Sequence, residues 1–223
     1  LFRSSAASDV YKRQLQVAIA DVAEIVEPSS SIDKEALSRG TSIYFPKRVI
    51  PMLPEEISNN LCSLIPNEDR NVLVCKMNFT QEGEINSYDF SESVINSHKR
   101  FTYNEVEFLK QNKDTNLSAD ILNSINALEK LTKQLLHNRS KRYALEIESS
   151  EPTLSFGNEG NISEIFIPKR LFAHQMIEEA MISANICAAK FIKKYLGFGV
   201  YRIHEEPESV SYTHLRAHET GYN

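Results

Sequence analysis

Apolar and polar residues alternate along several short stretches of the chain, and this period of two predicts β-strands. Polar connections join some of these stretches: QEGE, with Gly83, lies between one pair and GNEG between another, which predicts two hairpins. The stretches that we predict as strands are residues 15–21, 71–79, 85–94, 143–148, 153–156, 162–167 and 200–203.

A period of 3.6 residues predicts two long helices. The first follows Ser118, which can cap it, and its apolar face consists of Ile121, Leu122, Ile125, Leu128, Leu131, Leu135 and Leu136. The second covers residues 172–195, carries a broad apolar stripe and ends before Gly197. Hairpins with few helices indicate an α+β fold, with a mostly antiparallel sheet packed with two long helices.

Between the first strand and the first hairpin the pattern is irregular. Ser29 to Ser31 with Asp33 can cap a short helix over residues 34–38, which Gly40 can end. Prolines 46, 51 and 54 then predict a stiff loop around Tyr44 without regular structure. A helical turn is expected to begin at Pro54.

Composition restricts the class of protein. The 223 residues, 41% of them hydrophobic, suffice for one large domain or two small ones, and one continuous domain is the simpler interpretation. The cysteines Cys62, Cys75 and Cys187 are odd in number and widely spaced, which favours a reducing compartment, the cytoplasm by default. No run of about 18 apolar residues occurs, so we expect no membrane-spanning helix. The net charge of −5 argues against a protein that coats duplex nucleic acid, but not against a locally basic internal channel.

The run RGTSIYFPKRVIPMLPEEISNNLCSLIPNEDR, residues 39–70, closely resembles the RNB catalytic domain of the ribonuclease II and ribonuclease R exoribonucleases, as does EEAMISANICAA further along. The resemblance covers residues 15 to about 207. It implies a partial RNB catalytic domain from a monomeric 3′→5′ exoribonuclease that hydrolyses single-stranded RNA to 5′-mononucleotides. It also implies flanking cold-shock and S1 domains, which this chain lacks. Whether the subfamily is ribonuclease II or ribonuclease R stays open.

The same resemblance implies three RNA-binding residues. Tyr44 matches a tyrosine that stacks on the 3′-terminal base, Tyr103 one that helps to distinguish ribose from deoxyribose, and Glu178 a glutamate that acts with them. Stacking suits an enzyme that accepts any sequence, because every base has a π-face. Without the resemblance, the simpler interpretation is that Tyr44 is a packed structural residue, because aromatic residues serve cores more often than sites. Glu178 would then mark the edge of a buried helix face.

Other positions near these residues leave alternatives open. His98, Lys99 and Arg100 either meet phosphates or form a solvated strand end. We expect Glu179 to be structural. The phenylalanine with which the family clamps RNA aligns with Ile147, which cannot stack, so either the clamp has only Tyr44 or another aromatic residue such as Phe156 substitutes.

Family members hold a divalent metal, usually Mg²⁺, with an aspartate cluster just before the strand at residue 15, because hydrolysis needs several converging carboxylates. Here that stretch contains only Asp9, and Asp21 matches a later family aspartate that is not a ligand. We therefore expect no catalytic residue, no bound metal and no hydrolysis by this chain alone. One alternative is a metal-free RNB-like module that binds RNA or regulates. Another is an unrelated α+β hydrolase with Glu178 and Glu179 as acid and base.

Residues 1–14 and 209–223 lack any period and are interpreted as non-native read-through, which leaves residues 15–208 as the partial RNB domain. The alternative is a native disordered tail at each end. His214 and His218 have a spacing that suits a metal on a helix, but they lie in the second of these segments.

Overall fold

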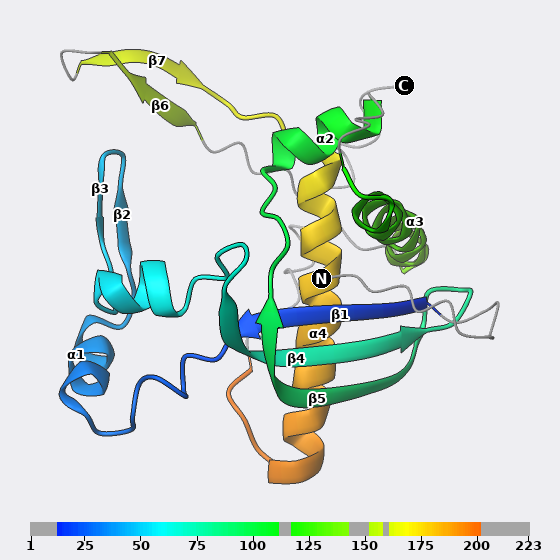
Figure 1. Cartoon of the computed structure of the whole chain (residues 1–223), viewed down its shortest axis with the longest axis horizontal. Coiled ribbons are helices and arrows are strands. Elements are labelled where there is room, and N and C mark those ends of the chain that lie inside the picture. Colours follow the sequence, from blue (N-terminus) through cyan, green and yellow to red (C-terminus); the bar gives the residue numbers. More distant parts are fainter. Residues whose placement is uncertain (1–12, 112–116, 143–151, 158–160, 202–223) are drawn as a thin grey trace, which may run out of the picture. The chain divides into compact units, whose positions relative to one another are not determined.

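The computed structural model describes residues 13–111, 117–142, 152–157 and 161–201 (Figure 1). Its elements are β1 (Arg13–Ala20), α1 (Ser31–Arg39), β2 (Ile43–Phe45), β3 (Arg48–Ile50), the π-helical segment η1 (Glu56–Leu61), β4 (Asp69–Phe79), β5 (Ile85–Asn96), α2 (Tyr103–Gln111), α3 (Ala119–Lys141), β6 (Thr153–Phe156), β7 (Ile162–Phe166) and α4 (Phe172–Leu196). The strand predicted at residues 143–148 and nearly all of both predicted end segments lie outside the described residues.

The largest sheet has the antiparallel order β1, β4, β5, with β4 in the middle (Figure 1). Because neighbouring side chains along a strand alternate between faces, one face collects the apolar positions of β1 and β4. That face packs with α3 and α4 in a core of Leu15, Val17, Cys75, Met77, Phe79, Leu131, Ala180, Ala184 and Cys187. The predicted α+β fold, a mostly antiparallel sheet packed with two long helices, is confirmed.

Local capping explains where the predicted helices begin and end. The Ser30 hydroxyl accepts a hydrogen bond from the Asp33 backbone N–H at the start of α1, and Gly40 ends that helix in the left-handed conformation. Ser118 caps α3 in the same way, through the Ile121 N–H. These predictions are confirmed, as are both predicted hairpins, β4 with β5 and β6 with β7.

The prediction that the segment around Tyr44 lacks regular structure is wrong. Ile43–Phe45 pairs with Arg48–Ile50 in an antiparallel hairpin in which Tyr44 faces Val49 across the strands. The prolines permit this because Pro46 lies in the two-residue turn, where its fixed φ is tolerated, and Pro51 follows the last paired residue. The helical turn predicted after Pro54 is present and continues as η1.

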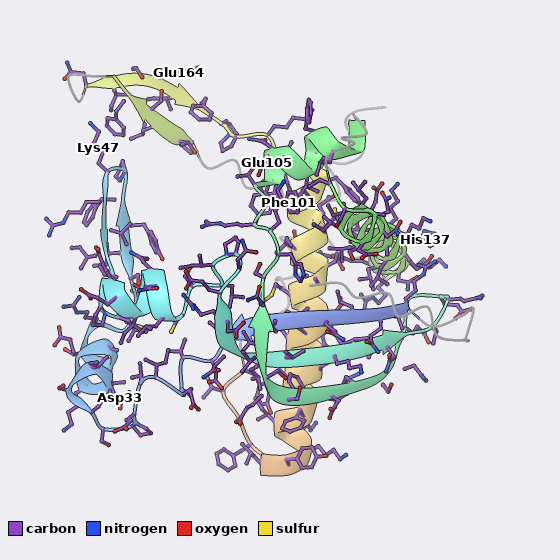
Figure 2. All side chains as sticks on the ribbon, viewed as in Figure 1. Asp33, Lys47, Phe101, Glu105, His137 and Glu164 are labelled. Atoms are coloured by element: carbon purple, nitrogen blue, oxygen red, sulfur yellow. The ribbon has the colours of Figure 1, made fainter. Side chains whose placement is uncertain are left out.

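Sequence reasoning missed α2, although its start carries a recognisable signal. The Glu105 carboxylate accepts hydrogen bonds from the Thr102 backbone N–H (2.6 Å) and hydroxyl (2.9 Å), and the Glu105 N–H donates to the Thr102 hydroxyl (3.2 Å). This is a capping box, and Figure 2 shows Glu105 in the first turn of α2. The bond from the Thr102 N–H is the main reason that the pKa of Glu105 is lowered. A threonine three residues before a glutamate could have predicted the helix.

The turn between β4 and β5 is tied to α3 through Glu82. Its backbone carbonyl accepts hydrogen bonds from the side-chain amides of Gln134 (3.1 Å) and Asn138 (2.6 Å). The next residue, Gly83, has a φ of +79°, and a Cβ there would lie 2.7 Å from Gln134 Cγ. The sequence of this turn is therefore constrained both by its backbone and by its contact with α3.

Replacing Gly83 with alanine is expected to lower the free energy of unfolding by about 1–2 kcal/mol, because an L-residue in the left-handed region is strained by that amount. The contact with Gln134 adds to the loss. Denaturant unfolding measures it, and Gly40→Ala is the matched control, since Gly40 also has a positive φ but no atom within 4 Å of the added Cβ. A loss at Gly83 no larger than that at Gly40 would contradict a role for the α3 contact.

The chain divides into two compact units, residues 1–187 and 188–223. In the described part of the second unit, the Phe191 and Tyr195 rings contact each other in the last turns of α4, and Gly197 follows the helix at a φ of +73°. The strand predicted at residues 200–203 is absent at residues 200 and 201, where the Val200 side chain is fully exposed and so buries no apolar surface. Residues 202 and 203 lie outside the described ranges.

Candidate nucleic-acid interface

Tyr44 stands on the β2–β3 hairpin and is 78% exposed. Its neighbours Ile43 and Phe45 are also exposed, and Figure 2 shows Lys47 at the tip of the hairpin. The hairpin thus presents an aromatic ring to solvent close in sequence to positive charge. An exposed ring on a stiff element is suited to stack on a nucleobase.

The hairpin tip contacts a second aromatic residue. Lys47 Nζ lies 4.3 Å from the ring centroid of Phe156, at the end of β6, which is within cation–π range. Phe156 is the residue that we named as a possible substitute in the RNA clamp. That role stays a prediction, and Ile147, the aligned position, lies outside the described residues.

Tyr103 is the first residue of α2 and stacks on His174 in the first turn of α4. Their ring centroids lie 4.0 Å apart with an angle of 24° between the rings. Tyr103 nevertheless remains 44% exposed, so part of its side chain is open to a partner. Of the neighbouring basic residues, Lys99 places its Nζ 4.9 Å from the ring centroid of Phe101.

Glu178 lies one helical turn after His174 on α4 and binds two arginines. Arg139 of α3 donates to one carboxylate oxygen at 3.1 Å, and Arg170 donates to the other. Burial on its own raises the pKa of Glu178, but the hydrogen bonds and positive charges of Arg139 and Arg170 outweigh it and hold that pKa below the ordinary glutamate value. The side chain is therefore an anion that accepts hydrogen bonds.

Glu179 differs from Glu178 in being buried, at 5% exposure. Arg139 donates a hydrogen bond to the Glu179 carboxylate at 2.8 Å, in addition to the one that it donates to Glu178. These two hydrogen bonds are the main causes of the raised pKa of Arg139. A general acid at neutral pH needs a raised pKa, and Glu178 has a lowered one. Glu178 therefore does not fit the role of the acid in an unrelated hydrolase.

The N-terminal half of α4 brings two of the predicted residues together. Residues four apart on a helix share a face, so His174, which carries the Tyr103 ring, and Glu178 are neighbours. Tyr44 belongs to a different element, the β2–β3 hairpin. Sequence reasoning missed His174, Arg139 and Arg170, and for His174 the spacing of four from Glu178 was the available signal.

A site for a divalent metal is not found in the described ranges. Within them, no three His, Cys, Asp or Glu side chains come close enough together to hold an ion. Asp21 instead accepts a hydrogen bond from the Glu24 N–H at 3.3 Å. Nearly all of the stretch in which the resemblance places the metal ligands, before the strand at residue 15, lies outside the described residues. Within the same residues, no helix is long and apolar enough to span a membrane.

Comparison with known proteins gives a consistent set of relatives. The sequence matches the RNB domain family over residues 5–220. It is 42% identical to ribonuclease R of Escherichia coli over 92% of this chain and 25% of that protein, and 32% identical to exoribonuclease 2 of Aeromonas hydrophila over 86% and 29%. The structure resembles Mycoplasma genitalium RNase R in complex with ribose methylated single-stranded RNA, with a TM-score of 0.84 and 32% identity over 92% of this chain and 33% of that one. The chain spans about a quarter of the length of the curated ribonuclease R relatives that it matches.

Proposed function

The chain belongs to the RNB domain family, and on that premise we propose that it serves a cytoplasmic, monomeric 3′→5′ exoribonuclease as the part that positions single-stranded RNA. The whole enzyme hydrolyses RNA to 5′-mononucleotides with a divalent metal, and flanking cold-shock and S1 domains help to feed RNA in. The division of this chain at residues 14 and 209 into native and read-through parts remains a prediction.

The observation that carries this proposal is the exposed Tyr44 ring on a short hairpin, with Lys47 at the hairpin tip. A ring that is fixed before the RNA arrives binds a base without a large loss of conformational freedom. Tyr103 and Glu178 supply a second, more polar region. A phenol can donate to or accept from a ribose hydroxyl, and a carboxylate with two oxygens retains acceptor capacity beside its two arginines.

We expect no hydrolysis by this chain alone, because the stretch in which the family holds its aspartate cluster contains only Asp9 here. The expected behaviour is RNA binding without cleavage. The competing proposal is a metal-free RNB-like module that binds RNA or regulates as a whole protein. The longer reading frame separates the two: an aspartate cluster before the β1 strand favours the enzyme, and its replacement in an intact gene favours the module.

The proposal is tested with the full chain and a 3′-labelled single-stranded RNA. We expect saturable binding by fluorescence anisotropy and no release of nucleoside monophosphates with or without Mg²⁺. Failure to bind RNA while circular dichroism shows a folded chain would remove the RNA-positioning role. Mg²⁺-dependent release of monophosphates would instead show that the chain holds a complete catalytic site.

A further inference from the structure

The stack of His174 on Tyr103 joins two helix starts that are distant in sequence. Each ring sits in the first turn of its helix, Tyr103 at the beginning of α2 and His174 near the beginning of α4. A centroid distance of 4.0 Å and an angle of 24° define a stacked pair, in which the imidazole covers one face of the phenol ring.

His174 is held by its own helix end. Its Nδ1 accepts a hydrogen bond from the Leu171 backbone N–H at 3.1 Å, and its backbone N–H donates to the Leu171 carbonyl at 3.1 Å. The bond to Nδ1 is one half of a capping box, with imidazole in place of the usual Glu or Gln side chain, and the bond to the Leu171 carbonyl is a backbone turn. Because the bond from Leu171 fixes the ring, His174 offers a rigid surface to Tyr103.

The backbone at Tyr103 lies within the Thr102–Glu105 capping box, which fixes the start of α2. The helix starts that carry the two rings are thus both fixed by hydrogen bonds of their own helices, before any partner binds. Such pre-placement is what a recognition site needs, because a ring that must be ordered on binding loses affinity.

Glu178 completes the arrangement, one turn from His174 on the same face of α4 and fixed by Arg139 and Arg170. The resemblance already implies that Tyr103 and Glu178 select ribose over deoxyribose; we propose that His174 is the positioning residue that fixes the Tyr103 ring for this selection. This inference rests on the proposed function of the same site as a binding site for single-stranded RNA. The 2′-hydroxyl is the group that it would read.

Two substitutions separate the ring of His174 from its hydrogen bond. His174→Gln keeps an acceptor for the Leu171 N–H, since Gln is a normal capping-box residue, but removes the ring. His174→Phe keeps a ring for Tyr103 but removes the acceptor. A purely structural role predicts that His174→Gln behaves as wild type and His174→Phe does not, whereas the positioning role predicts the reverse for ribose selection.

The test measures dissociation constants of the full chain for oligo(A) and oligo(dA) of equal length, which carry identical bases. We expect His174→Gln to unfold at the wild-type temperature and to lose between about twofold and tenfold of the RNA-over-DNA preference, the equivalent of one aromatic pair. His174→Phe is expected to retain that preference when measured well below its unfolding midpoint. His137→Gln, at an exposed histidine on α3, is the control and is expected to change neither value (Figure 2).

The outcomes distinguish this inference from the proposed function. If the wild-type chain binds neither oligonucleotide, the RNA-binding function fails and the role of His174 fails with it. If the wild type prefers RNA but His174→Gln keeps the full preference, or His174→Phe loses as much as His174→Gln, the RNA-binding function stands and the positioning role is overturned.

Discussion

Replacing Arg139 with methionine is expected to lower the free energy of unfolding by about 3 kcal/mol, because removal of one partner leaves a buried charge without compensation. Arg139 donates to both Glu178 and Glu179, and the Glu179 side chain is almost fully buried. Methionine preserves most of the apolar stem that an arginine packs against its surroundings. The loss is therefore attributable to the guanidinium rather than to packing, and denaturant unfolding with an unchanged m-value measures it.

The pH dependence of this loss has a definite sign. The pKa of Glu178 is lowered in the folded chain, so its contribution to stability is complete above the ordinary glutamate range and disappears as the pH falls through the lowered value. The difference between wild type and Arg139→Met should therefore be largest at neutral pH and should shrink on acidification. A difference that stays constant down to strongly acidic pH would contradict the ionic origin of the effect.

Two further variants sharpen the test. Lys133→Met removes a mostly exposed cation that pairs with Glu129 on the same helix, and a surface pair of this kind contributes less than about 1 kcal/mol. In contrast, adding Glu179→Gln to Arg139→Met should restore part of the stability, because the buried charge is then gone as well. If Lys133→Met costs as much as Arg139→Met, burial of the α3–α4 ion pair is not what makes it important.

The predicted and the missed elements are both defined by interactions between residues close in sequence, so the misses come from how local signals were interpreted. The β4–β5 hairpin and the starts of α1 and α3 are specified by alternation and by capping residues within a few positions, so the sequence was sufficient for them. The start of the α2 helix is also specified locally, by Thr102 and Glu105, but it follows a basic cluster that we interpreted as either a phosphate-binding group or a solvated strand end. The β2–β3 hairpin was missed because prolines were treated as breakers without regard to their place in a turn.

The sequence indicated the candidate site residues but not the contacts that surround them. Tyr44, Tyr103 and Glu178 were named from a family resemblance, and the roles assigned to them remain predictions. The contacts that surround them join positions far apart: Arg139 is 39 residues from Glu178, and His174 reaches Tyr103 from a different helix. No periodicity in the sequence encodes such pairs, since they arise only when α2, α3 and α4 pack in one fold. Of these relations, the sequence alone indicates only that His174 and Glu178, four residues apart on one helix, share a face.

The substitution with the largest expected effect on RNA affinity is Tyr44→Ala. Stacking of one base on an aromatic side chain is worth about 1–3 kcal/mol, so the dissociation constant for single-stranded RNA should rise between about fivefold and 150-fold. Tyr44 is 78% exposed and lies outside the core cluster, so the same substitution should leave the unfolding transition nearly unchanged. Affinity and stability are thus affected independently, which a structural tyrosine would not permit.

Controls around Tyr44 identify the ring as the cause. Tyr44→Phe should bind RNA with wild-type affinity, because it keeps an aromatic face that stacks on a base. Tyr44→Leu should bind as weakly as Tyr44→Ala, because it has no such face. Val49→Ala alters the cross-strand partner of Tyr44 without removing the ring, and it should affect the hairpin but have little effect on binding. The loss for Tyr44→Ala should be similar with oligo(A), oligo(C) and oligo(U), because stacking tolerates any base. Equal affinities for Tyr44→Leu and Tyr44→Phe would show that the exposed ring is not the stacking surface.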